Sequence, residues 1–289
     1  MKNANIIKIA DRIVSLDEHN IVNRLPYEET DGFYNVWKID SGGVEYILKR
    51  VAQNEKDFYA QQKVDLSVFP KCFGTTSFYG KDYILLEFVN GKNLMKCNRK
   101  QLVKVLDAMI ELQNAYFEGD EQIGQPFEEF VESANARRQH LEDDELVQAF
   151  DVFLKDYMSI ARTLCHDDLL PFNVILSGER VVFIDWEHSG FLPYPTMLAR
   201  FVAHTSEHGE TPFFMAKEDV EFAIEYFYEH FVKLKGIDFE TYRFSLECCL
   251  FFESIEWVYV YNKYGKERDA FFDYSFALAK DRAKSLLLK

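Results

Sequence analysis

The chain has 289 residues, a hydrophobic fraction of 48% and a formal net charge of −15 at pH 7. This length suits one large domain or two lobes with separate cores, and the apolar content excludes a disordered chain. The acidic balance argues against a nucleic-acid partner, because a phosphate backbone needs clustered Lys and Arg. It is compatible with a cationic small substrate, but a charge that serves solubility alone is the better-supported interpretation.

The sequence is expected to lack a membrane span and a signal peptide. Its apolar runs are shorter than the roughly 18–20 residues that cross a bilayer, so we expect no membrane insertion. The first ten residues lack the apolar segment and cleavage site of a signal peptide. The five cysteines show neither a pairing framework nor metal-ligand spacing, which is typical of a reducing cytosol. We therefore expect a cytoplasmic protein.

The first third of the chain is predicted to be rich in β-structure. A helix is expected over residues 54–64, with Asn54 as its N-cap. Gly42 and Gly43 favour a tight turn, and the strands on either side of them would form a hairpin. Alternating apolar and polar residues predict strands over 33–39, 44–49, 77–79 and 83–88.

After residue 90 the hydrophobic period changes to that of helices. Apolar residues recur at three- and four-residue intervals, which predicts helices over 102–112, 146–160, 220–234 and 242–264. The loop Asn90-Gly91 marks the expected boundary, with an N-terminal nucleotide-binding lobe over residues 1–89 and a C-terminal catalytic and substrate-binding lobe over 90–289. A small β lobe before a large α lobe is the layout of a bilobal kinase.

The segment from Cys165 to Leu176 points to a chemistry. Asp168 and Asn173 lie five positions apart on a tight loop before a hydrophobic strand, and Asp185 ends the next apolar run. Phosphoryl transfer needs one acid that positions the attacking hydroxyl, and an amide oxygen and a second acid that hold Mg²⁺ against the phosphates. Taken separately, Asn173 is also a suitable turn residue and Asp185 a suitable strand-end cap. Their combination favours the metal site.

Two motifs carry a resemblance to a known family. The run His166 to Asn173 resembles the H-x-D-L-x-P-x-N loop of the aminoglycoside phosphotransferase and choline kinase superfamily. Ile184-Asp185-Trp186-Glu187 resembles the I-D-[WF]-E segment of the same superfamily, and the resemblance covers nearly the whole chain. It implies an α+β, bilobal, protein-kinase-like fold with a small antiparallel β N-lobe and a large, mainly α C-lobe.

The resemblance also implies an activity. It predicts a kinase that moves the γ-phosphate of ATP, or of GTP, to a hydroxyl of a small molecule such as an amino alcohol like choline, an aminoglycoside or a sugar. Asp168 is the candidate base, and Asn173 and Asp185 are the candidate Mg²⁺ ligands. His166 is expected to brace the loop backbone, while Asp167 is an additional charge without an assigned role.

Lys49 is the predicted contribution of the first lobe to phosphate binding. It ends the strand 44–49 between apolar residues, as does the lysine on strand β3 of protein kinases. The alternative is an edge-strand lysine whose ammonium reaches solvent. Glu55 on the next helix is the expected acidic partner of Lys49, although Asp57 is also available.

Two further segments are expected to contact the nucleotide. Gly32 and Asn35 match the G-x-x-N-x-x-[YW] phosphate loop of the small-molecule kinases, in which backbone N–H groups cradle phosphates. The strand Ile84 to Val89 resembles the hinge, so Glu87 and Val89 are predicted to bind the base through their backbone.

One position departs from the family pattern. The family usually has Asp-Leu-Ala on the helix after I-D-W-E, and the matching triplet here is Met197-Leu198-Ala199. In the family that Asp braces the catalytic loop, so its absence is the one feature that supports an alternative reading, a non-catalytic kinase-like binding protein. A metalloprotein using His204 and His208 is a third hypothesis, which the missing Glu of that motif disfavours.

The acceptor pocket is expected in the second lobe. Four acidic and aromatic residues recur there at helical spacing, and such a surface suits an amine or a quaternary ammonium group. A core helix with solvated acids would show the same pattern, so both interpretations stay open. The residues are Glu253, Glu256, Trp257 and Tyr261.

Overall fold

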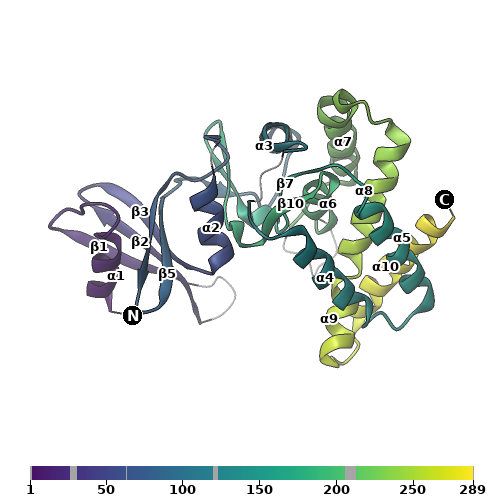
Figure 1. The fold of residues 1–289 in the computed structure, drawn as a ribbon, viewed down its shortest axis with the longest axis horizontal. Coiled ribbons are helices and arrows are strands. Elements are labelled where there is room, and N and C mark those ends of the chain that lie inside the picture. Colours follow the sequence, from purple (N-terminus) through teal and green to yellow (C-terminus); the bar gives the residue numbers. More distant parts are fainter. Residues whose placement is uncertain (1, 27–30, 63, 120–122, 206–212, 289) are drawn as a thin grey trace. The chain divides into compact units, whose positions relative to one another are not determined.

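The computed structural model describes residues 2–26, 31–62, 64–119, 123–205 and 213–288 (Figure 1). The chain divides into two compact units. The first unit combines residues 1–92 with residues 175–188, and the second combines residues 93–174 and 189–289. The segment 175–188 therefore belongs with the first unit, although it lies far beyond residue 89.

The first unit is built on an antiparallel sheet whose strands have the order β1-β2-β3-β5-β4. The predicted hairpin is present as β2 and β3, in which Ser41 pairs with Val44 across the glycine turn. The strands are β1 (Asn20–Pro26), β2 (Phe33–Ser41), β3 (Val44–Val51), β4 (Cys72–Phe78) and β5 (Lys81–Glu87). The two-residue strand β6 (Lys92–Asn93) follows at the point where the chain leaves this unit.

Helix α1 (Asn3–Ala10) covers one face of this sheet, beside β1 in Figure 1. Side chains of successive strand residues point to opposite faces, so Trp37 and Ile39 on β2 share a buried face. Ile6 and Ile9, three positions apart on α1, pack into the same core. The burial of this face fixes which residues of β2 and β3 point the other way.

Helix α2 (Gln53–Gln61) follows β3 along the chain and packs against the segment after β9 within the first unit. The helix begins after Ala52, and within the described residues no side chain caps it, so the prediction that Asn54 is the N-cap was wrong. Phe58 stacks on Trp186 with ring centroids 4.7 Å apart and an interplanar angle of 8°. Because residues three apart share a helix face, Glu55 also faces this segment.

The segment that joins the first unit late in the chain is a short hairpin. It consists of β8 (Val174–Ser177) and β9 (Arg180–Phe183), followed by a 3-10 turn over Trp186–His188. The turn between the strands contains Gly178 with a φ of 63°, a conformation that glycine adopts without strain. The indole N–H of Trp186 donates to the carbonyl of Phe183 at 2.8 Å, which holds the residues in between in place.

The second unit is mainly helical and contains one antiparallel pair, β7 (Arg162–His166) with β10 (Ser189–Pro193). In this pair Ser189 lies opposite His166, so β10 supports the start of the predicted catalytic loop, His166 to Asn173. The helices are α3 (Arg99–Tyr116), α4 (Phe127–Arg138), α5 (Asp144–Tyr157), α6 (Pro195–Ala203), α7 (Lys217–Phe227), α8 (Phe239–Ser254), α9 (Glu256–Tyr264) and α10 (Ala270–Leu287).

Two of the predicted helices are interrupted in the structure. The predicted helix 242–264 is α8 followed by α9, with a break at Ile255. The predicted helix 220–234 corresponds to α7 up to Phe227, then one π turn and one 3-10 turn that end at Gly236. Gly236 has a φ of 78°, the left-handed conformation that commonly stops a helix.

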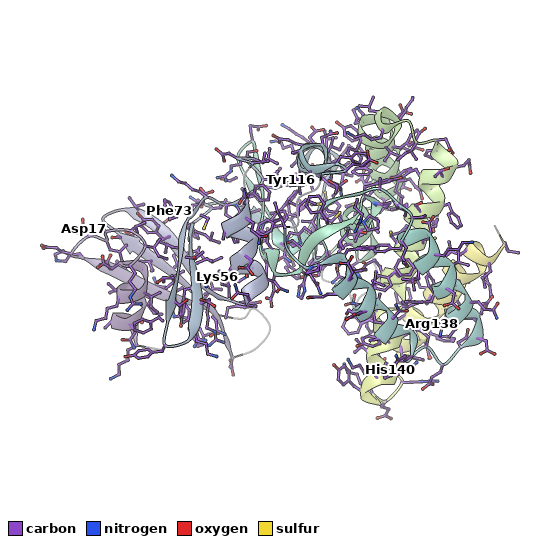
Figure 2. All side chains as sticks on the ribbon, viewed as in Figure 1. Asp17, Lys56, Phe73, Tyr116, Arg138 and His140 are labelled. Carbon is purple, nitrogen blue, oxygen red and sulfur yellow. The ribbon has the colours of Figure 1, made fainter. Side chains whose placement is uncertain are left out.

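Aromatic packing holds the helices of the second unit together. Phe153 on α5 stacks on Phe252 of α8, with ring centroids 4.6 Å apart. Arg138 at the end of α4, labelled in Figure 2, forms a two-pronged ion pair with Asp151 of α5 at 2.7 and 2.8 Å. The Arg138 pair is partly exposed, and it contributes less to stability than the apolar contacts.

Asp143 is expected to stabilise α5 both as its N-cap and as an ion-pair partner. It accepts hydrogen bonds from the N–H groups of Glu145 and Leu146 and pairs with Lys280 of α10 at 2.7 Å. We expect Asp143→Ala to lower the free energy of unfolding by about 1–2 kcal/mol at neutral pH, measured by urea unfolding. Asp143→Asn keeps a cap acceptor and should retain part of that stability. An Asp143→Ala variant as stable as the parent would contradict this role.

The pH dependence of this contribution follows from the pKa of Asp143. Burial acts to raise that pKa, but the Lys280 ammonium and the helix N–H groups outweigh it and hold the pKa below 3.8. A carboxyl group with a depressed pKa stabilises the fold at higher pH, and this contribution is lost as the pH falls through the folded-state pKa. The difference between the parent and Asp143→Ala should therefore shrink below about pH 4.

No helix in the described part of the chain is long and apolar enough to span a bilayer. The five cysteines, all of them in described residues, are free thiols, and Cys165 is a buried residue of β7.

Candidate functional site

Lys49 lies at the centre of a charged triad in the first unit. Its ammonium is 2.6 Å from a carboxylate oxygen of Glu55 on α2 and 2.6 Å from Oδ1 of Asp185. The ion pair with Glu55 is the one predicted, whereas Asp57 instead accepts a hydrogen bond from Gln53. On β3, Lys49 pairs with Val36 and Ile84 in the neighbouring strands, which fixes its position.

Burial and the neighbouring charges shift the pKa values of Glu55 and Lys49. Burial raises the pKa of Glu55 to about 7, and the Lys49 ammonium opposes this while the Asp185 carboxylate adds to it. Burial would lower the pKa of Lys49, but the carboxylates of Glu55 and Asp185 outweigh it and raise that pKa. Lys49 is therefore a permanent cation at neutral pH, with its ammonium held between two acids.

Asp185 follows β9 in an unusual backbone conformation with a φ of 69°. Asp is one of the few non-glycine residues that adopt this conformation at modest cost. The carboxylate is the exposed member of the triad, with 47% of its side chain accessible. Carboxylate oxygens of Glu55, Asp185 and Glu187 lie within 4.8 Å of one another, a donor set of the hard kind that Mg²⁺ prefers.

The predicted phosphate loop leads into β2. Gly32 lies immediately before this strand and Asn35 lies within it. The side-chain oxygen of Asn35 accepts a hydrogen bond from Arg24 at 3.2 Å, and Arg24 also donates to the Tyr34 carbonyl at 2.7 Å. Arg24 thus ties β1 to the start of β2, and binding of phosphates by this segment stays a prediction.

The predicted hinge lies at the end of β5. The Glu87 carboxylate accepts hydrogen bonds from Arg180 at 2.6 Å and from the Lys71 N–H at 2.8 Å. Its own N–H donates to the Lys71 carbonyl at 2.9 Å. These contacts fix the position of Glu87 within the first unit. Val89 follows the strand and is half-buried, and the nucleotide contacts of both residues remain predictions.

In the second unit, the predicted catalytic loop, His166 to Asn173, folds around Asp168. The Asp168 N–H donates to Nδ1 of the buried His166 at 3.3 Å, so His166 braces the loop backbone as expected. The Asn173 amide nitrogen donates to the Asp168 carbonyl at 2.8 Å and lies 3.3 Å from its Oδ2. This assignment leaves the amide oxygen of Asn173 as the atom suited to bind a cation.

The other carboxylate oxygen of Asp168 contacts an arginine that the sequence did not suggest. Nη2 of Arg200, on α6, donates to Asp168 Oδ1 at 2.7 Å. Nη1 of the same guanidinium donates to Glu253 at 2.8 Å and to Glu256 at 2.7 Å. One largely buried cation therefore joins the loop around Asp168 to the α8–α9 junction.

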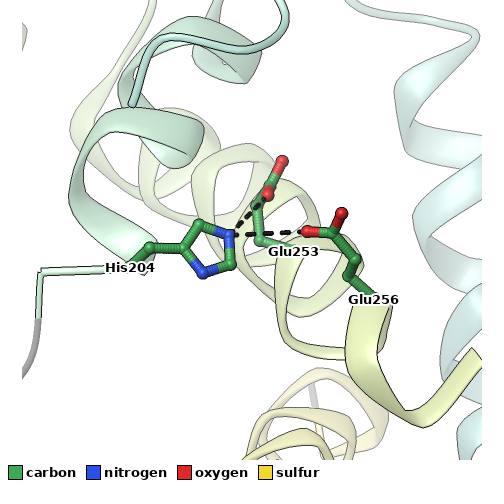
Figure 3. A group of neighbouring side chains, drawn as sticks. All are labelled: His204, Glu253 and Glu256. Atoms are coloured by element: carbon green, nitrogen blue, oxygen red, sulfur yellow. Dashed lines mark hydrogen bonds and ion pairs between the residues drawn. The ribbon is translucent and has the colours of Figure 1, made fainter. Parts of the chain in front are cut away.

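His204, one turn after Arg200, completes this cluster (Figure 3). Its Nε2 lies 3.1 Å from Glu253 and 3.7 Å from Glu256, as the dashed lines in Figure 3 show. Burial would raise the pKa of Glu253, yet Arg200 and His204 lower it to about 2. Glu253 is thus an anion at neutral pH. His208, the second residue of the metalloprotein hypothesis, lies outside the described residues.

The pKa of Asp167, the residue next to the candidate base, shifts in the opposite direction to that of Glu253. Burial and the Glu253 carboxylate raise the pKa of Asp167 well above its usual value, although Arg200 and Arg137 oppose the shift. The neutral acid is accordingly favoured at Asp167. Asp168, the next residue of the loop, is the acid that Arg200 contacts.

The residues expected to line an acceptor pocket separate into two groups. Glu253 and Glu256 are engaged by Arg200, whereas Tyr261 donates its hydroxyl to Asp269, the N-cap of α10, at 2.9 Å. Trp257 packs against Phe271 with ring centroids 5.2 Å apart. A small hollow of about 40 Å³ lies there, lined in part by His204, Glu253, Trp257, Phe271 and Tyr274.

Met197, at the family's Asp position, is wholly buried in α6. Sequence reasoning noticed this substitution but did not find Arg200, which is three residues further along the same helix. The available signal was a single basic residue inside the apolar run Pro195 to Ala203. A buried helix retains such a residue only if it finds acidic partners.

Comparisons with known proteins fit this geometry. A model of the phosphotransferase enzyme family (APH) matches residues 30–211, a range that contains Lys49, Asp168, Asn173 and Asp185. Protein LicA of Haemophilus influenzae is 26% identical over 133 residues, or 46% of this chain. The match spans 37% and 46% of the lengths of the two curated LicA chains.

Solved structures resemble the whole chain. The amicoumacin kinase hAmiN, solved in complex with AMP-PNP, Ca²⁺ and Ami, superposes with a TM-score of 0.63 at 14% identity, over 99% of this chain and 93% of its own. A choline kinase from Cryptosporidium parvum gives a TM-score of 0.62 at 13% identity, over 99% of this chain and 96% of its own. The predicted α+β, protein-kinase-like fold class is thereby confirmed.

Proposed function

Since the chain belongs to the phosphotransferase enzyme family, we propose that it transfers the γ-phosphoryl group of ATP to a hydroxyl of a small molecule. The observation that carries the proposal is the triad of the first unit, in which Lys49 is held between Glu55 and Asp185. A strand lysine paired with a helix glutamate is the arrangement that protein kinases use to bind phosphates. A cytoplasmic location, supported by the free thiols, is part of the same proposal.

Within the first unit, we assign nucleotide binding to Lys49. Its ammonium would bind phosphate oxygens, and Glu55 would keep it directed towards them. The backbone at Gly32 and Asn35 would cover the phosphates, and the end of β5 would receive the base, with GTP as an alternative to ATP. Buried Glu55, 1% accessible, cannot itself meet solvent, which suits a supporting role.

The donor set around Asp185 fits a divalent cation. We propose Asp185 as the principal Mg²⁺ ligand, with Asn173 as the second ligand that the sequence pattern predicts. When bound, Mg²⁺ would neutralise charge on the nucleotide phosphates during transfer. The relative hAmiN was solved with AMP-PNP and Ca²⁺, which supports nucleotide and divalent-metal use here. Lys49 would exchange part of its contact with Asp185 for the phosphates.

In the second unit, we propose that Asp168 orients the acceptor hydroxyl and accepts its proton. Its Oδ1 is held by Arg200 at 2.7 Å, so Oδ2, whose contact with the Asn173 amide is longer at 3.3 Å, is the oxygen that would meet the hydroxyl. Phosphoryl transfer depends mostly on positioning and on electrostatic stabilisation. The Asp168 carboxylate, held in place by Arg200, would provide the positioning. The acceptor class is proposed to be an amino alcohol such as choline, an aminoglycoside or a sugar.

The test of this function is phosphate transfer to a panel of acceptors. We expect ATP consumption and a phosphorylated product, detected by mass spectrometry, with at least one amino alcohol, aminoglycoside or sugar. Chelation of Mg²⁺ with EDTA should lower the rate by about 100-fold or more, and added Mg²⁺ should restore it. ATP binding without turnover across the panel would instead support a non-catalytic binding protein.

A further inference from the structure

Arg200 gathers three carboxylates around one guanidinium, and one of them belongs to the candidate base. Its two terminal nitrogens divide these partners, with Nη2 on Asp168 and Nη1 on Glu253 and Glu256. The side chain is only 13% accessible. A guanidinium presents its donors in a rigid planar fork, so the contact on one side fixes the direction of the other.

The same helix lacks the residue that the resemblance leads one to expect. Met197 replaces the Asp that braces the catalytic loop in the family, and its side chain is wholly buried. Arg200 lies nearly one turn further along α6. It reaches the loop directly, through the carboxylate of Asp168.

We propose that Arg200 is the positioning residue for Asp168 in this chain and that Glu253 and Glu256 hold Arg200 in place. This rests on the proposed function, because Asp168 is the residue assigned to the acceptor hydroxyl. In this chain Arg200 would support the loop by holding the carboxylate of Asp168, where the family resemblance predicts an aspartate that contacts the loop itself.

The geometry explains why one arginine can do this. His166 and the Asn173 amide hold the backbone of Asp168, and the same amide nitrogen makes a long contact of 3.3 Å with Oδ2, whereas Arg200 makes the shorter contact of 2.7 Å with Oδ1. Arg200 fixes Oδ1, and so Oδ2 has one defined direction. Because a misplacement of about 1 Å can cost about 100-fold in rate, this orientation bears directly on kcat.

The anchoring acids make the position specific for arginine. The Glu253 side chain is only 7% accessible, and leaving its charge unpaired would destabilise the fold. A cation at position 200 is therefore expected to pair with Glu253 first. A lysine offers a single nitrogen, which Glu253 and Glu256 would capture together. Asp168 would then lose its contact even though the net charge of the cluster is unchanged.

The test compares Arg200→Ala with Arg138→Ala. Both variants remove an arginine that pairs with an aspartate in the second unit. The partner of Arg138 is Asp151, whereas the partner of Arg200 is Asp168. We expect Arg200→Ala to lower kcat by about 10–100-fold, with KM for ATP changed less than about two-fold. Arg138→Ala should keep the parent kcat.

Chemical rescue separates positioning from a structural role. Millimolar guanidinium chloride should restore part of kcat in Arg200→Ala, while sodium chloride at the same ionic strength should not. If Arg200→Ala does not fold, Arg200→Lys carries the test, with a melting temperature close to that of the parent and a reduced kcat. A parent-like kcat in the folded variant, or a loss that follows the melting temperature and resists guanidinium, overturns the proposal.

A second measurement tests the contact between Arg200 and Asp168 even if the protein phosphorylates no acceptor. If the parent phosphorylates no acceptor, that function is refuted, and the contact itself is tested by thermal unfolding. The shift in melting temperature that Asp168→Asn causes should differ between the parent and the Arg200→Ala background, because the two side chains are coupled. Equal shifts in both backgrounds overturn the inference independently of any activity.

Discussion

Replacing Asp168 with Asn is expected to lower kcat for acceptor phosphorylation by about 10²–10⁴-fold. The substitution keeps the size of the side chain, and its amide oxygen can still accept the hydrogen bond from Arg200. The remaining atom becomes an N–H₂ group, which cannot accept the proton of the acceptor hydroxyl. Steady-state kinetics with the acceptor identified in the panel measure the effect.

Asp167 provides the matched control. Its raised pKa favours the neutral acid, and Asn has nearly the same shape as a neutral Asp side chain. We therefore expect Asp167→Asn to retain a kcat within about three-fold of the parent, since surface and loop changes without a lost charge have small effects. If Asp168→Asn were fully active, or if Asp167→Asn had the larger defect, the assignment of the base would be wrong.

The second large effect is expected from Lys49→Met. Methionine fills the space of the lysine stem but removes the cation that would bind the phosphates. We expect kcat/KM for ATP to fall by about 100-fold, which corresponds to about 2.7 kcal/mol of lost transition-state stabilisation. The pKa of Glu55 is already raised to about 7, so this residue can become neutral, and the variant should remain folded.

Lys56 on α2 is the appropriate comparison for Lys49. It also forms an ion pair in the first unit, with Asp82 at 2.8 Å, but both side chains of that pair are about one-quarter accessible. Lys56→Met should leave kcat/KM for ATP unchanged, because this surface pair does not involve the triad. Equal losses in the two lysine variants would show that the effect of Lys49→Met is non-specific, and an active Lys49→Met would refute its role.

Local patterns were sufficient to predict much of the fold. The hairpin of β2 and β3 follows from alternation around Gly42 and Gly43, and the long helices follow from their apolar period. The break at Ile255 was not predictable in this way, because no Gly or Pro interrupts the period there. Helix α1 was also missed, since its two buried isoleucines become meaningful only once the sheet that they cover is known.

The candidate site shows the same contrast between local and distant relationships. Lys49 and Glu55 are six residues apart, so a strand followed by a helix was enough to predict their pairing. The family resemblance, which the family match confirms, supplied Asp168 and Asp185 through motifs of fixed spacing. Arg200 meets residues 32 to 56 positions away, and such contacts depend on how helices pack.

The burial of Met197 limits which side chains position 197 can accept. An aspartate introduced there would place a charge in an apolar environment, at a cost of several kcal/mol unless it found a partner. A single Met197→Asp substitution should therefore destabilise the second unit, so the acid typical of the family could be restored at this position only together with a partner for it.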